Sequence, residues 1–132
     1  MFSRKKQPPI KSLIAQGTRV NGDVLFADGI RIDGEVVGDV RAVPDLPSIL
    51  VVSESAKVQG ALHAVHVIIN GTVEGPVHAT ELLELQPKAR ITGDVHYKAL
   101  EMHQGGVISG QMCPTLPLLE DKPTLKLASN AS

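Results

Sequence analysis

The chain has 132 residues, which is enough for one domain with flanking tails. Its 13 basic and 14 acidic residues give a formal net charge of −1, which excludes a global electrostatic attraction to nucleic acid or to an anionic membrane. With no Trp, one Tyr and two Phe, the chain is expected to fold around a narrow core of aliphatic side chains, and its 12 Gly and 9 Pro disfavour long helices.

The cysteine content and the lengths of the apolar runs indicate in which cellular compartment the protein resides. Cys113 is the only cysteine, so no internal disulfide forms, which suits a reducing environment. No apolar run approaches the ~18 residues of a membrane span, and none follows the N-terminal basic residues as a secretory signal would. We therefore expect a cytoplasmic protein.

Residues 1–15 are expected to form a disordered tail that begins with a membrane-contact segment. Phe2 can enter the interfacial region of a bilayer while Arg4, Lys5 and Lys6 meet anionic headgroups, each basic residue contributing about 1 kcal/mol. N-myristoylation is excluded, because Phe2 stands where the modified Gly is required. The alternative is a solvated tail that contacts no membrane.

Residues 16–113 carry an internal repeat of a β-branched residue, any residue, Gly, any residue and an apolar residue. Its six copies are residues 20–24, 36–40, 58–62, 73–77, 91–95 and 108–112. Successive glycines lie 16, 22, 15, 18 and 17 residues apart, and the longest interval contains an expected inserted loop at Pro44 to Pro47. Such a period is typical of one coil of a solenoid.

A second pattern lies upstream of the glycine in every copy after the first. It is an alternating apolar pair: Ile30/Ile32, Leu50/Val52, Val67/Ile69, Leu83/Leu85 and Leu100/Met102. Alternation of this kind predicts short strands with one buried face. The two patterns together predict a domain that is all-β, a single parallel β-helix (solenoid) of about six coils.

Two other β architectures fit less well. A left-handed hexapeptide helix would repeat its apolar residue every six positions, and intervals of 15, 16 and 17 break that rule. An antiparallel sandwich would carry hairpin turns such as Asn70-Gly71, but this pair already occupies a corner of the repeat.

Three histidines, His63, His78 and His96, each lie three residues after a repeat glycine. The solenoid therefore predicts an outward-facing histidine ladder with rings ~4.8 Å apart, continued by Arg41 and Cys113. Parallel rings do not converge on one ion, so we expect an exposed ladder and no metal site. A further hypothesis is pH sensitivity: stacked like charges disfavour protonation of the histidines, so acid is expected to strain the rod.

Few residues suggest catalysis. Asp23, Asp39 and Asp94 follow the glycine in three different coils, and no phosphate-binding loop is present. The acidic residues Glu35, Glu54, Glu74, Glu81, Glu84 and Glu101 are interpreted as solvated. We expect no enzyme and no cofactor.

The two ends of the rod are the expected assembly surfaces, because unpaired strand edges template further pairing and no capping helix follows the last coil. The contact residues at these ends are expected to be Val20, Val24, Leu25, Phe26, Leu100, Met102, Ile108 and Met112. The open alternative is that residues 12–15 cover the first coil as a cap, which would give a monomer.

Residues 114–132 contain three prolines and end in Ala-Ser-Asn-Ala-Ser, so they are expected to form a disordered linker-like tail. A segment for docking an unidentified protein partner is one interpretation of its leucines, Leu116, Leu118, Leu119, Leu125 and Leu127.

The run from Ile32 to Val40, the motif Val73-Glu-Gly75 and the series of Val-x-Gly coils resemble the bactofilins over residues 16–113. This resemblance implies a right-handed β-helix, a handedness that agrees with the general preference for right-handed crossovers. It also implies a bacterial cytoskeletal protein that forms non-polar filaments without nucleotide, often at the membrane, and scaffolds shape and envelope functions. Many members carry Phe in the last coil at the filament contact, where this sequence has Ile108.

We therefore expect a self-assembling cytoskeletal scaffold that is cytoplasmic and peripheral at the inner membrane surface. The alternative is a monomeric or dimeric β-helix adaptor that binds a protein partner through its flat faces. A β-helix enzyme acting on envelope glycan is a more distant interpretation, and no nucleic-acid partner is expected.

Overall fold

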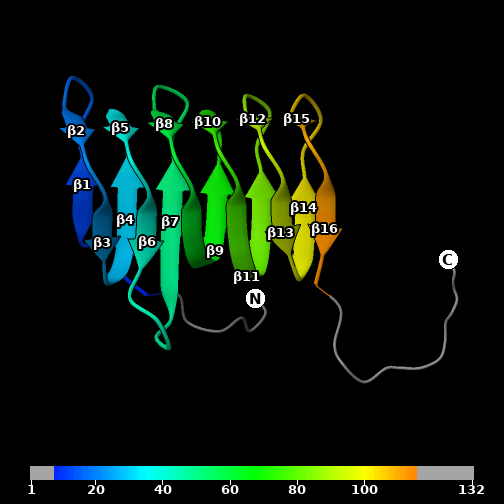
Figure 1. Cartoon of the computed structure of the whole chain (residues 1–132), viewed down its shortest axis with the longest axis horizontal. Helices are drawn as coiled ribbons and strands as arrows, with labels where there is room; N and C mark the ends of the chain where they lie inside the picture. The colour runs from blue at the N-terminus through cyan, green and yellow to red at the C-terminus, as the bar shows by residue number, and fades with distance from the viewer. Residues whose placement is uncertain (1–7, 116–132) are drawn as a thin grey trace, which may run out of the picture.

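The computed structural model describes residues 8–115, and every regular element in that part of the chain is a β-strand. The strands stack side by side into a rod, with β1 at one end and β14 to β16 at the other (Figure 1). This confirms the all-β parallel solenoid of about six coils.

Each coil contributes three strand segments. The first two coils contain β1 (Ser12–Ile14), β2 (Arg19–Asn21), β3 (Val24–Phe26), β4 (Asp28–Ile32), β5 (Glu35–Val37) and β6 (Val40–Ala42). The middle coils contain β7 (Ser48–Val52), β8 (Lys57–Gln59), β9 (Leu62–Ile69), β10 (Thr72–Glu74), β11 (Val77–Leu85), β12 (Arg90–Thr92) and β13 (Val95–Tyr97). The last coil contains β14 (Ala99–Met102), β15 (Val107–Ser109) and β16 (Met112–Pro114).

The rod has three strand faces. The long-strand face consists of β1, β4, β7, the second halves of β9 and β11, and β14. The glycine face consists of β2, β5, β8, β10, β12 and β15. The histidine face consists of β3, β6, the first halves of β9 and β11, β13 and β16.

The strand register reproduces the repeat. On the glycine face, the β-branched residue of each copy pairs with that of the next, from Val20 and Val36 to Ile91 and Ile108. On the long-strand face the upstream pairs align in the same way, so that Leu83 pairs with Leu100 and Leu85 with Met102. Every pairing is parallel, which places like residues above one another along the rod.

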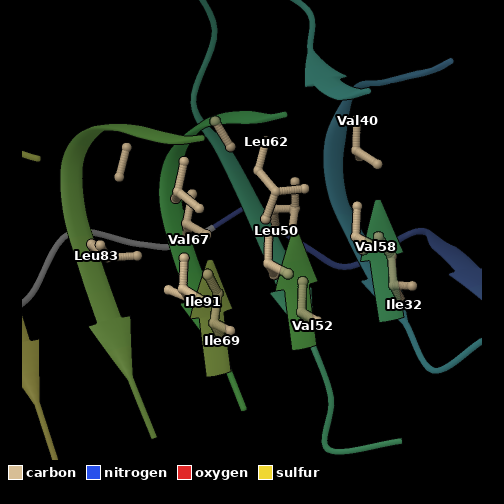
Figure 2. Close-up of a cluster of buried hydrophobic side chains, with 14 of the residues drawn as sticks. Ile32, Val40, Leu50, Val52, Val58, Leu62, Val67, Ile69, Leu83 and Ile91 are labelled. Carbon is tan, nitrogen blue, oxygen red and sulfur yellow. The ribbon is translucent and has the colours of Figure 1, made fainter. Parts of the chain in front are cut away.

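The core is a set of aliphatic columns, as the aromatic-poor composition predicted. Side chains of Ile32, Leu50, Val67 and Leu83 point into the interior (Figure 2), and all four residues are 0% exposed. Aliphatic side chains stack well at strand spacing because they have similar volumes and carry no polar atoms.

Glycines hold the corners of the coils close together. At Gly93, where φ is +143°, an added Cβ would lie 2.5 Å from the carbonyl oxygen of Gly75 in the preceding coil. Only Gly tolerates both this backbone conformation and this approach, which explains its recurrence in the repeat.

The solenoid begins earlier than residue 16. Ser12–Ile14 forms β1, which pairs in parallel with β4, with Ile14 opposite Ile32. These residues add a strand to the long-strand face and do not fold across the end as a cap. The inserted loop separates β6 from β7, as the long glycine interval predicted.

Candidate functional site

The C-terminal end of the rod exposes the apolar columns of the core. Met102 is 46% exposed and Met112 is 45% exposed, whereas their register partners one coil inward, Leu85 and Val95, are 0% exposed. Leu100 and Ile108 in the same coil are half-buried and pack against the core cluster. The difference arises because no further coil of the described chain covers the last one.

The N-terminal end shows the same contrast with smaller residues. Val20 and Val24 are half-buried, whereas their partners Val36 and Val40 are 0% exposed. Ile14 on β1 belongs to the same surface and was missed at the sequence level. A signal was present, because Ser12 and Ile14 precede Gly22 by the ten and eight residues that separate Leu100 and Met102 from Gly110.

Two residues expected at the N-terminal contact lie elsewhere. Phe26 is only 5% exposed and belongs to the core cluster, because it alternates with the exposed Leu25 and points inward like Val24. Leu25 alternates with them, is 68% exposed and continues the outward column of Arg41 on the histidine face. Phe26 therefore lies in the core, and Leu25 lies on the outward side of the histidine face.

Within residues 8–115, no further coil pairs with the backbone groups at either end of the rod. Within the rod, the N–H groups of Gly93 and Val95 donate to the carbonyls of Ser109 and Gln111, each at 2.9 Å. Beyond the equivalent donors of the last coil, Gly110 and Met112, the described chain contains no further coil. In the described part of the chain, each end thus combines an apolar patch with strand edges that have no strand beside them, which is a surface for adding strands.

The predicted histidine ladder is present. His63, His78 and His96 are in register, and their rings stack with centroids 4.3 and 4.4 Å apart and interplanar angles of 8° and 7°. Burial lowers the pKa of His63, and the Arg41 charge lowers it further against the opposing effect of Asp39. Burial also lowers the pKa of His78, with added repulsion from His63 and His96.

One group within the described residues has donor atoms close enough to hold a metal ion. Glu84, Glu101 and His103 place one ligand atom each within 4.8 Å of one another at the edge of the last two coils. His103 Nε2 lies 3.1 Å from Glu84 Oε2. Glu101 is exposed, as its interpretation as a solvated residue requires, whereas Glu84 is half-buried.

The tail residues expected to bind partners lie outside the described part of the chain. These are Phe2, Arg4, Lys5 and Lys6 at the N-terminus, and the leucines after residue 115. Within residues 8–115, no helix is long and apolar enough to cross a membrane.

The parallel coils, the aliphatic columns and the two open apolar ends define a β-solenoid with surfaces suited to self-association. The family model for bactofilins, described as polymer-forming cytoskeletal, matches residues 12–113. The chain therefore belongs to the bactofilin family, a family of cytoskeletal proteins. No curated protein and no solved structure matches the chain significantly.

Proposed function

We propose that this bactofilin is a scaffold that assembles end to end into non-polar filaments without nucleotide. The filaments lie in the cytoplasm at the inner membrane surface and support cell shape or envelope organisation. The observation that carries the proposal is the exposure of Met102 and Met112 in columns whose inner members are fully buried.

Burial of the apolar residues at the ends provides a driving force for assembly. Fully burying one aliphatic side chain contributes roughly 1.5–3 kcal/mol of stabilising free energy. Covering a half-exposed residue contributes part of that amount, and the contributions of the residues at one end add up. Pairing of the open strand edges adds directional hydrogen bonds. The flexible thioethers of Met102 and Met112 adapt readily to a surface of the same kind.

Contacts between like ends favour a filament without polarity. A two-fold contact buries the same patch on both subunits, and alternating contacts at the two ends extend the chain of subunits. In this arrangement Leu100, Met102, Ile108 and Met112 form one contact, and Ile14, Val20 and Val24 form the other.

Electron microscopy of the full chain without nucleotide or metal tests the assembly. We expect long thin filaments in the wild type, and short or no filaments for Ile108→Arg, which places a charge in the C-terminal contact. Ser109→Arg is the matched control, because Ser109 is the next residue on β15 and is exposed.

Each outcome has a clear meaning. Filaments in the wild type and in Ser109→Arg but not in Ile108→Arg support the C-terminal contact. Unchanged filaments in Ile108→Arg show that assembly uses another surface. Small particles in all three proteins favour the adaptor that binds a partner through its faces.

The membrane contact has a separate test. Residues Phe2, Arg4, Lys5 and Lys6 provide one aromatic and three positive charges per subunit, and a filament multiplies this weak attraction. We expect a chain lacking residues 1–7 to co-sediment less with anionic liposomes than the full chain. Equal co-sedimentation would contradict this contact.

A further inference from the structure

The segment that leads into the first strand lies along the side of the rod. The Lys11 N–H donates to the carbonyl oxygen of Gly29 at 3.0 Å, and Lys11 Nζ lies 2.9 Å from Asp28 Oδ2. Both partners belong to β4 in the second coil, so residues 8–11 are fixed beside the long-strand face.

Residues 9 and 10 pack directly on Gly29, and we call this contact the seat of the segment. A Cβ added to Gly29 would lie 2.7 Å from the Pro9 carbonyl oxygen, 2.9 Å from Ile10 Cα and 3.0 Å from Ile49 Cγ2. Ile49 pairs with Gly29 in register and points outward like it, yet it is only 7% exposed. The segment therefore packs in the space that a larger side chain would fill, and the described part of the chain begins at this face, at residue 8.

The long-strand face has an apolar character around this seat. Leu13 is 60% exposed and Ile10 is 49% exposed, and the half-buried Val51 and Ile68 continue the outward row of Leu13. The charge of Arg31 in that row is paired with Asp33 at 2.9 Å. The same row continues into Glu84 and Glu101 farther along the rod. On the glycine face the corresponding outward row is charged from its first coil, with Arg19, Glu35, Lys57 and Arg90.

We propose that the long-strand face is the side of the filament that lies against an anionic lipid surface, with Gly29 as the residue that positions the N-terminal anchor there. This inference rests on the proposed membrane contact of residues 2–6. Seven residues span at most about 25 Å when extended, so the anchor holds the face from which it leaves close to the bilayer. The exposed apolar residues Ile10 and Leu13, together with the basic residues at positions 4–6 of the preceding sequence, match the headgroup boundary of such a membrane.

The proposal constrains the filament. All anchors contribute together only if neighbouring subunits present the same face to the bilayer. For like-end contacts, this requires two-fold axes perpendicular to the long-strand face. Glu84 and Glu101 lie toward the C-terminal part of this face, away from the seat of the anchor.

Single fluorescent labels on the full chain test which face meets the lipid. In a Cys113→Ser background, an environment-sensitive dye is attached at Leu13→Cys or Ala99→Cys on the long-strand face, or at Thr92→Cys on the glycine face as control. All three positions are exposed. With phosphatidylglycerol-containing vesicles, we expect a blue shift at Leu13 and Ala99 and none at Thr92.

The outcomes separate this inference from the membrane contact itself. Co-sedimentation with a shift at Thr92 equal to or larger than that at Ala99 overturns the assignment of the face but leaves the membrane contact intact. Ala99 adjoins Leu100 in the proposed C-terminal contact, so the label there is read on assembled protein before and after vesicles are added. A shift at Ala99 that the vesicles do not increase also overturns the assignment. If the protein does not co-sediment at all, the proposed membrane contact fails and this inference fails with it.

Gly29→Val tests the seat, with Ala27→Val as the matched control because Ala27 is exposed two residues earlier. We expect trypsin to cut after Lys11 several-fold faster in Gly29→Val, and the contrast between the labels at Ala99 and Thr92 to shrink. Unchanged cleavage and unchanged contrast would show that Gly29 does not position the anchor.

Discussion

At the scale of single residues, the repeat glycines serve two purposes that substitutions can separate. Gly22 and Gly93 both have positive φ, +134° and +143°, but an added Cβ at Gly22 has nothing within 4 Å. We expect Gly22→Ala to lower the free energy of unfolding by about 1–2 kcal/mol from backbone strain. Gly93→Ala should cost about 1–3 kcal/mol more, because its Cβ meets the Gly75 carbonyl. Urea unfolding at matched concentration measures both, and equal losses would contradict the steric role.

The histidine ladder should make stability depend on pH. The pKa values of His63 and His78 are lowered in the folded rod, mainly by burial, whereas the pKa of an unfolded histidine lies near its ordinary value of 6.5. Below 6.5 the unfolded chain therefore binds more protons, and stability that is complete above this pH is lost as the pH falls. We expect Tm to drop between about pH 7.5 and about pH 5.5, and His78→Gln to reduce the drop. An equal drop in that variant would show that the ladder is not responsible.

At the scale of elements, β1 determines where the stable rod begins. The carbonyl oxygen of Ile14 accepts hydrogen bonds from the N–H groups of Asp33 and Gly34 at 2.7 and 3.0 Å. A chain that starts at residue 16 should expose Ile30 and Ile32 on β4 and melt several degrees lower than one that starts at residue 12. Hydrogen exchange should show loss of protection at Asp33 and Gly34. Equal melting and protection would mean that β1 adds nothing to the fold.

Sequence patterns predicted the elements wherever each coil repeats the same residue type. The register of Val36, Val58 and Val73, and the stacking of His63 on His78, follow from a regular in-out alternation. β1 was missed because Ser12 occupies an apolar column, so its pair lacks the repeated pattern.

Features of the candidate site that depend on contacts through space could not be predicted from the repeat. Phe26 was assigned to the end surface, but alternation alone does not show how deeply the first coil buries an inward ring. The seat at Gly29 joins residues 9 and 10 to residues 29 and 49, which no local pattern connects. Such contacts form only between segments that the folded chain brings together.

At the scale of the whole molecule, the rod has two different ends, and two kinds of filament are conceivable. The carbonyls of Val37 and Asp39 accept hydrogen bonds from the coil before them, and Asn21 and Asp23 occupy the equivalent positions in the first coil. A head-to-tail contact would join these acceptors to Gly110 and Met112 of the next subunit. Two-fold contacts, as we propose, would instead pair like ends.

Variants blocked at one end distinguish these filaments. If like ends meet, Ile108→Arg retains the N-terminal contact and Val20→Arg retains the C-terminal one, so each variant alone should sediment as a dimer. If the filament is head to tail, each variant alone should be a monomer. A mixture of the two variants labelled in different colours then gives the opposite test. Like-end assembly predicts no mixed species, whereas head-to-tail assembly predicts a mixed dimer, because the intact C-terminal end of Val20→Arg can bind the intact N-terminal end of Ile108→Arg.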